Sequence, residues 1–222
     1  MERIGLTREL MALKAAEQLE DGMYVNLGIG LPSLVSDFIP NNIEVVLQSE
    51  NGILGMSNIA KEEDWDPDLV NASGNPINVI PGVSYFDSAL SFGMIRAGHI
   101  DICFLGAYQV SEQGDLANWR TATETKGGSV GGAMDLAAGA KKVIVLMDHI
   151  TRTGIPRIVK ECSIPVTAKK VVRTIITNLA LMEVADNRLI VKEIAPGISI
   201  EDIKSLTEPD LIIAKDIQYM NL

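Results

Sequence analysis

The residues from Lys142 to Met147 constrain the fold of this chain more than any other segment. Their sequence, Lys-Val-Ile-Val-Leu-Met, is apolar after its first residue and lacks the polar alternation of a strand with one face in water. An unbroken run of this kind is typical of a central strand in a parallel sheet that is covered on both faces.

Shorter segments extend this pattern along the chain. We predict strands at 24–25, 43–47, 77–80, 100–106, 188–194 and 211–214, helices at 7–20, 32–38, 87–97, 133–138 and 171–179, and irregular structure at 56–76. Ser199, followed three residues later by Asp202, resembles a capping box at the start of one more helix. Strands that alternate with helices predict an α/β fold with a mainly parallel sheet.

Length and composition limit the classes to which the chain can belong. The sequence has 222 residues, 47% of them hydrophobic, so residues 1–222 are expected to form a single domain. A net charge of -10 argues against a nucleic-acid partner, because phosphate binding needs a basic surface. No run of about 18 apolar residues predicts a membrane span.

The N-terminus and the cysteines favour a cytoplasmic protein. Residues 1–4 lack the layout of a signal peptide, and Cys103 and Cys162 are far apart in sequence, which favours reduced thiols. Cys103 lies in an apolar run and is expected in the core. No CxxC or HExxH motif occurs, and His99 and His149 are isolated in sequence, so we expect no metal site.

Three polar turns follow predicted strands, and ligands of open α/β sheets bind at the carboxyl ends of strands. The turn 26–30 offers an amide side chain and glycines, the turn 49–52 offers the carboxylate of Glu50, and the turn 127–132 offers backbone N–H groups at a helix start. Each has a plain structural interpretation as well. Glycine turns most often only reverse the chain, and a loop glutamate is most often solvated.

Several longer motifs occur in order along nearly the whole chain and resemble the 3-oxoacid class (class I) of CoA-transferases. The run 47–55, Leu-Gln-Ser-Glu-Asn-Gly-Ile-Leu-Gly, resembles the active-site signature of that class, and the segments 21–32, 85–88, 94–99, 114–119 and 131–136 match its pattern too. The resemblance is to the B subunits of the acetoacetate, butyrate, acetate and succinyl-CoA:3-ketoacid enzymes. It implies their three-layer α/β fold and a separate A-type partner chain, in an A/B pair or a dimer of such pairs.

The resemblance also implies roles for single residues. Glu50 would be the nucleophile that carries CoA covalently between an acyl-CoA and a short carboxylic acid, and its ordinary pKa of about 4.3 leaves it ionised without a helper base. Gly132 matches a glycine whose N–H forms part of an oxyanion hole, and Asn26 matches an asparagine that positions the glutamate. The remaining matched residues imply substrate or CoA binding: Gly28, Gly30, Asn51, Gly52 and Gly131. CoA is then a substrate, and no permanently bound cofactor is implied.

Two departures from the class keep other hypotheses open. Ser129 and Val130 stand where the class usually has Gly-Met, within an atypical segment 120–130, and no lysine occurs at 71–76, where some members contact CoA. A catalytically inactive CoA-ester-binding homologue is therefore an alternative. A sugar-phosphate isomerase is a third hypothesis by fold analogy, which the lack of basic residues around the glycine turns disfavours. The acyl pair is not fixed, since acetoacetate with succinyl-CoA, acetyl-CoA or butyryl-CoA fits, as does 3-oxoadipate.

Overall fold

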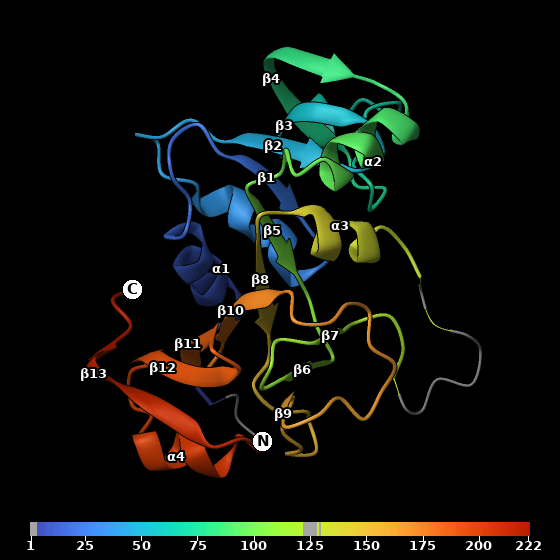
Figure 1. Cartoon of the computed structure of the whole chain (residues 1–222). Helices are drawn as coiled ribbons and strands as arrows, with labels where there is room; N and C mark the ends of the chain where they lie inside the picture. The colour runs from blue at the N-terminus through green and yellow to red at the C-terminus, as the bar shows by residue number, and fades with distance from the viewer. Residues whose placement is uncertain (1–3, 122–127, 129) are drawn as a thin grey trace.

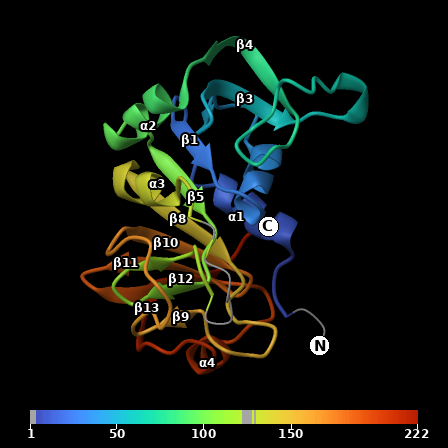
Figure 2. The same cartoon turned by 90° about the vertical axis from the view of Figure 1, so that its right-hand side faces the viewer.

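One sheet of ten strands runs through the molecule (Figure 1). The computed structural model describes residues 4–121, 128 and 130–222. The strand order is β13-β12-β11-β10-β8-β5-β1-β2-β3-β4, and Figure 2 shows this order from β4 at the top to β13 near the bottom. The strands are β1 (Tyr24–Leu27), β2 (Val46–Ser49), β3 (Ile53–Ile59), β4 (Ile77–Tyr85), β5 (Ile102–Leu105), β8 (Lys142–Met147), β10 (Val172–Thr177), β11 (Ala180–Ala185), β12 (Arg188–Ile194) and β13 (Leu211–Tyr219).

The middle of the sheet is parallel, and antiparallel pairs lie toward both ends. Strands β2, β1, β5, β8 and β10 pair in parallel. Toward one end β3 and β4 pair antiparallel with their neighbours, and toward the other end β11 does so with β10 and β12. The run Lys142–Met147 is the central strand β8, and all of it except Lys142 is buried. The prediction of a central, covered strand is confirmed.

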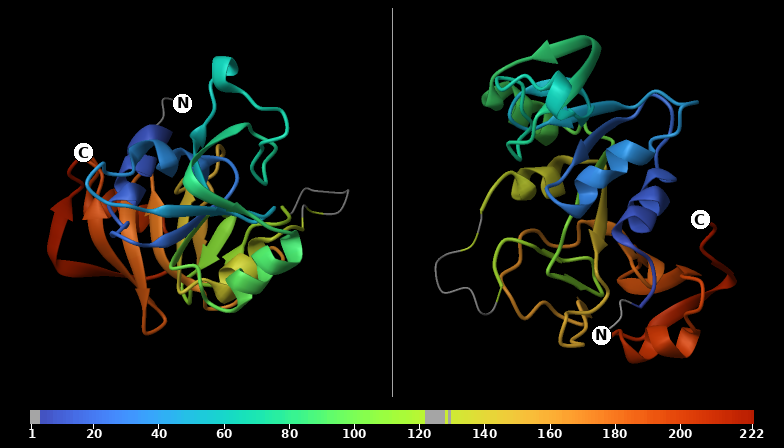
Figure 3. Two further views of the ribbon diagram at one scale, coloured as in Figure 1. Left: turned by 90° about the horizontal axis from the view of Figure 1, so that it is seen from above. Right: turned by 180° about the vertical axis from the view of Figure 1, so that it is seen from behind.

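Helices cover both faces of the sheet, which gives three layers (Figure 3). On one face α1 (Arg8–Ala16) packs against the 3-10 helix η1 (Leu31–Phe38), and on the other α2 (Ser88–Arg96) packs against α3 (Ala133–Gly139). The expected α/β fold with three layers is confirmed.

A small second sheet lies beside the carboxyl ends of the central strands. Its order is β7-β6-β9, formed by β6 (Gln109–Ser111), β7 (Leu116–Ala117) and β9 (Ile158–Val159). Because β9 pairs in parallel with β6, the chain that follows β8 returns beside the chain that follows β5. The two segments together form one wall of the site described below.

The remaining elements test two local predictions. The helix α4 (Ile200–Ser205) begins with the predicted capping box, in which the Ser199 hydroxyl accepts from the Asp202 N–H and the Asp202 carboxylate accepts from the Ser199 N–H. Residues 56–76 are not wholly irregular, because β3 continues to Ile59 and a short 3-10 helix, η2, spans Glu62–Asp64.

The prediction of a helix at 171–179 is wrong. Six of these residues, Val172–Thr177, form strand β10, which pairs with β8 on one side and with β11 on the other. The segment is rich in valine, threonine and isoleucine, whose branched side chains fit a pleated strand better than a helix. The apolar residues Val172, Ile175, Ile176 and Leu179 happen to have helical spacing, and this spacing misled the prediction.

The side chains of Cys103 and His149 are both buried within the protein. Cys103 is fully buried, as expected, and burial together with the nearby charge of Glu50 raises the pKa of its thiol. The ring of His149 lies between two hydroxyl groups, 2.9 Å from Thr177 Oγ1 and 2.9 Å from Thr207 Oγ1. Burial lowers the pKa of His149 to about 4, so this ring is neutral and structural.

The close packing of α2 and α3 at Gly139 provides a test of the fold. A Cβ on Gly139 would lie against the backbone carbonyl of Ile95 and 3.2 Å from the Cα of Arg96. We predict that Gly139→Ala lowers the free energy of unfolding by about 2 kcal/mol, because the two helix backbones must move apart. Urea denaturation measures this change.

Gly93, in α2, is the matched control, because a Cβ there would meet nothing within 4 Å. Alanine is the better helix former, so Gly93→Ala should raise the free energy of unfolding by up to about 1 kcal/mol. Equal effects of the two substitutions would contradict the close approach of α2 and α3.

Candidate active site

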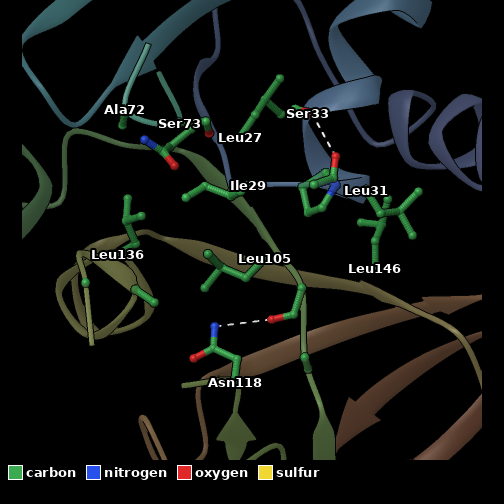
Figure 4. A pocket seen from close by; sticks show the side chains of 18 of the residues that line it. Leu27, Ile29, Leu31, Ser33, Ala72, Ser73, Leu105, Asn118, Leu136 and Leu146 are labelled. Carbon is green, nitrogen blue, oxygen red and sulfur yellow. Dashed lines mark hydrogen bonds between the residues drawn. The ribbon is translucent and has the colours of Figure 1, made fainter. Parts of the chain in front are cut away.

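A cavity of about 540 Å³ lies at the carboxyl ends of the parallel strands. Its lining comes from the segments after β1, β2, β5 and β8 and from the start of α3. Figure 4 shows Ala72 and Ser73 on one side of the cavity and Asn118 on the other, with Ile29 and Leu105 between them. This is the edge at which parallel α/β sheets bind ligands.

Glu50 is the first residue after β2, and its half-buried side chain lines the cavity. The chain turns there because the Gly52 N–H donates to the Ser49 carbonyl at 3.0 Å. Gly52 has φ 117°, and a Cβ on it would collide with the carbonyl of Phe86, so the turn accepts only glycine. The Ser49 hydroxyl accepts from the Ala72 N–H at 2.9 Å. Backbone contacts therefore fix the carboxylate at the strand end.

Gly132, at the start of α3, lies directly against the carboxylate of Glu50. Its backbone N–H donates a hydrogen bond to that carboxylate. A Cβ on Gly132 would lie 2.6 Å from the carboxyl carbon of Glu50, which is closer than two unbonded atoms can pack. Only a residue without a side chain permits this contact, so the fold joins the two residues to which the sequence resemblance assigns the reaction.

The pKa of the Glu50 carboxyl is raised above its ordinary value. Burial is the largest cause, the negative charge of Asp135 adds to it, and the hydrogen bond from Gly132 acts in the opposite direction. Asp135 is itself paired with Arg96, whose Nε lies 2.7 Å from its Oδ1. A carboxylate that water solvates poorly is more basic, and therefore more nucleophilic, than an exposed one.

Asn26 supports the strand that carries Glu50. Its side-chain amide donates to the Gln48 carbonyl at 3.2 Å and to Gln48 Oε1 at 2.6 Å, and the Gln48 amide donates to Ser91 Oγ at 2.7 Å. All three side chains are buried. Asn26 thus contacts the residue two positions before Glu50, and its assigned role of positioning Glu50 through Gln48 stays a prediction. The sequence did not reveal Gln48 and Ser91 as members of this network.

The residues expected to bind substrate or CoA divide into two groups. Those that line the cavity are Gly28, Gly30 and Gly131, and those outside its lining are Asn51 and Gly52. The Asn51 amide donates to the Val70 carbonyl at 2.8 Å and so joins the Glu50 turn to the loop before β4. Asn51 and Gly52 shape the turn in this structure, and the binding roles of all five residues stay predictions.

Other lining residues were given no individual role from the sequence. The loop before β4 brings Asn71, Ala72 and Ser73 to the cavity, and the buried Asn71 accepts from the Ser73 N–H at 2.9 Å. On the far side Asn118 donates to the Gly106 carbonyl at 3.2 Å (Figure 4). Tertiary folding alone brings these loops to the strand end.

The cavity also contains two cationic side chains that lie far from the glycine turns in sequence. Arg8 comes from α1, and Arg157 comes from the residue before β9. The turns themselves lack basic residues in the sequence, and tertiary folding brings these two arginines to the cavity.

The atypical segment 120–130 falls largely outside the described residues, which omit 122–127 and 129. Part of the glycine turn 127–132 is outside them as well, whereas Gly131 and Gly132 are described.

In the part of the chain that is described, no group of three or more His, Cys, Asp or Glu side chains could hold a metal ion. Within the same residues, no helix combines the length and the apolar character needed to cross a membrane.

Comparison with known proteins agrees with the geometry of the site. A family model described as Coenzyme A transferase matches residues 8–206. The chain belongs to the coenzyme A transferase family. It is 45% identical to the B subunit of a probable succinyl-CoA:3-ketoacid coenzyme A transferase of Bacillus subtilis, over 95% of this chain and 97% of that protein. It is 42% identical to the beta subunit of the acetate CoA-transferase of Escherichia coli, over 95% of each.

A third relative differs again in its named substrate. The B subunit of the 3-oxoadipate CoA-transferase of Acinetobacter baylyi is 44% identical over 94% of this chain and 96% of that protein. The chain is thus a CoA-transferase, and its resemblance to B subunits is confirmed. Relatives at nearly equal identity carry three different substrate names, so identity does not choose the acyl pair.

Solved structures show the same fold at low identity. The acyl-CoA transferase YdiF of Escherichia coli O157:H7 matches with a TM-score of 0.78 and 19% identity, and the match covers 100% of this chain but only 44% of that one. The glutaconate coenzyme A-transferase of Acidaminococcus fermentans matches with a TM-score of 0.70 and 17% identity, over 97% of this chain and 89% of that one. The decarboxylase AibA/AibB also has this fold, with a TM-score of 0.73 and 20% identity over 97% of this chain and 88% of that one. The residues of the site, and not the fold, must therefore decide the reaction.

The raised pKa of Glu50 predicts that this residue destabilises the folded protein at neutral pH. The folded state binds the Glu50 proton more tightly than the unfolded state, so ionisation disfavours folding above the raised folded-state pKa. This penalty disappears as the pH falls below the unfolded-state pKa. We expect Glu50→Gln to raise the melting temperature at neutral pH, with an advantage over the wild type that shrinks on acidification.

The exposed Glu44 provides the matched control, because Glu44→Gln removes the same charge from the surface. Thermal melts of both variants and the wild type across a pH series give the comparison. A lower melting temperature of Glu50→Gln at neutral pH, or an advantage independent of pH, would contradict the assigned burial of the carboxylate.

Proposed function

We propose that this chain is the catalytic subunit of a CoA-transferase that moves CoA between an acyl-CoA and a free carboxylic acid. The acids are short-chain acids or 3-oxoacids such as acetoacetate. The observation that carries the proposal is the Glu50 carboxylate, half-buried in the cavity with the Gly132 N–H bonded to it. This arrangement suits a carboxylate that reacts and becomes a covalent intermediate.

Each half of the proposed reaction moves CoA from one carboxyl group to another. The Glu50 carboxylate attacks the thioester carbonyl of the acyl-CoA. The C–S bond breaks, CoA leaves as a thiolate, and the acyl group remains on Glu50 as an acyl-glutamyl anhydride. The thiolate then attacks the glutamyl carbonyl, which releases the free acid and leaves CoA on Glu50 as a thioester. A second acid reverses these steps, so the reaction has ping-pong order.

The neighbours of Glu50 support this chemistry. When the thiolate attacks the glutamyl carbonyl, negative charge develops on the oxygen that Gly132 can bind, and one such donor contributes on the order of 3 kcal/mol to a transition state. Leu27, Leu105 and Leu136 line the same cavity. Apolar walls limit the water that would hydrolyse the anhydride.

The names of the relatives support an enzyme made of two kinds of chain. The relative from Bacillus subtilis is named as a B subunit, and the one from Escherichia coli is named as a beta subunit. We therefore assign this chain an A-type partner, in an A/B pair or a dimer of such pairs. Ile29 lines the cavity with 69% of its surface exposed, which suits a site that a partner completes.

A cytoplasmic location completes the proposal. Cys103 and Cys162 are both free thiols, which the reducing cytoplasm maintains.

The role of Glu50 predicts a large loss of activity on its replacement. With the A-type partner present, Glu50→Gln should lower kcat by at least about 10³-fold, because the carboxamide is a far poorer nucleophile than the carboxylate. Exchange of isotope label between an acyl-CoA and its free acid measures this rate, and Glu44→Gln should retain activity.

Two outcomes separate this proposal from its alternative. Label exchange by Glu50→Gln near the wild-type rate would contradict the assigned nucleophile. A wild-type complex that binds acyl-CoA but exchanges no label would favour a catalytically inactive CoA-ester-binding homologue.

A further inference from the structure

Arg157 lines the cavity with hydrogen-bond donors that the protein does not fully use. Its Nε is buried and has no hydrogen-bond partner in the described structure, and its Nη1 makes only a 3.4 Å bond to the Ala107 carbonyl. Among the described residues Arg157 forms no ion pair. The outer guanidinium nitrogens, with only the long bond to Ala107 among the contacts of the described residues, suit a ligand that supplies acceptor oxygens.

The backbone of Arg157 is held firmly at the edge of the sheet. Its N–H donates to the His149 carbonyl at 3.0 Å, and its carbonyl accepts from the Val110 N–H at 2.9 Å. These bonds join the chain after β8 to the small second sheet. The guanidinium therefore extends from a fixed base rather than from a free loop.

Arg157 and Glu50 reach the cavity from different strand ends. Ala107, which the guanidinium contacts, follows β5, whereas Glu50 follows β2, and β1 lies between these strands. Neighbouring strands are about 4.8 Å apart, so these two strand ends are separated by about 10 Å. The two side chains line the space between the strand ends, which leaves room for an acyl group of a few carbons.

We propose that Arg157 is a specificity residue that binds a second, distal carboxylate of the acyl group while Glu50 reacts at the first. This inference rests on the proposed CoA transfer. A guanidinium presents paired N–H donors that match the two oxygens of a carboxylate. Glu50 and Asp148 line the same cavity, and the whole chain has a net charge of -10, so a second substrate carboxylate needs such a cation. The preferred substrate class is therefore dicarboxylic acyl groups.

Two four-carbon substrates test this assignment. Succinyl-CoA ends in a carboxylate where butyryl-CoA ends in a methyl group, and the CoA is the same. With the A-type partner and acetate as the common acceptor, Arg157→Gln should lower the ratio of kcat/KM for succinyl-CoA to that for butyryl-CoA by roughly 10- to 100-fold. The ratio is taken within one preparation, so a smaller fraction of folded enzyme does not change it.

Two further variants separate the paired donors from charge alone. Arg157→Lys keeps the charge and loses the fork of donors, so it should lower the same ratio by less than Arg157→Gln. Arg8→Gln removes an exposed guanidinium from the same cavity and should leave the ratio unchanged.

A binding measurement makes the test independent of turnover. Calorimetric titration of the complexes with succinate and butyrate should show that Arg157→Gln weakens succinate binding roughly 10-fold or more and leaves butyrate binding unchanged. A wild-type complex that transfers no CoA would overturn the proposed function, while this titration still tests the subsite. Equal losses for both acyl-CoAs and both acids would overturn the subsite, because Arg157 would then contact the CoA phosphates or support the fold. Unchanged ratios would overturn it as well.

Discussion

The contact between the Gly132 N–H and the Glu50 carboxylate joins two parts of the fold that are held independently. Glu50 is fixed by the turn after β2, whose Gly52 fits under the Phe86 carbonyl, and Gly132 is fixed by α3, which packs on β5 and on α2. A Cβ on Gly132 would collide with the Glu50 carboxylate, so the contact requires a glycine. The site therefore requires a rigid sheet and a tightly packed pair of helices, and both are observed.

The ionised Glu50 at this contact serves the proposed reaction but destabilises the folded protein. Burial and the charge of Asp135 raise the pKa of Glu50, so the ionised form that the proposed reaction needs is the form that the folded protein solvates poorly. One N–H from Gly132 offsets part of this effect. A large apolar core, with β5 and nearly all of β8 buried, supplies the stability that permits such a site.

The sequence predicted those features that local pattern determines. The central strand β8, the capping box of α4 and the strand-end position of Glu50 follow from runs and turns of a few residues. Strand β10 was mistaken for a helix because its few apolar residues happen to follow helical spacing. Arg157 could not be predicted, since only the tertiary pairing of β9 with β6 brings it to the cavity.

The covalent role of Glu50 is the central claim, and chemical trapping tests it most directly. The complex of this chain with an A-type partner is incubated with acyl-CoA, treated with borohydride, digested and analysed by mass spectrometry. If Glu50 carries CoA as a thioester, borohydride should reduce the side-chain carboxyl group of Glu50 to a primary alcohol. No other carboxyl group should be reduced, and Glu50 should be reduced only when acyl-CoA was present. An unmodified Glu50 in a complex that exchanges label at full rate would contradict the account.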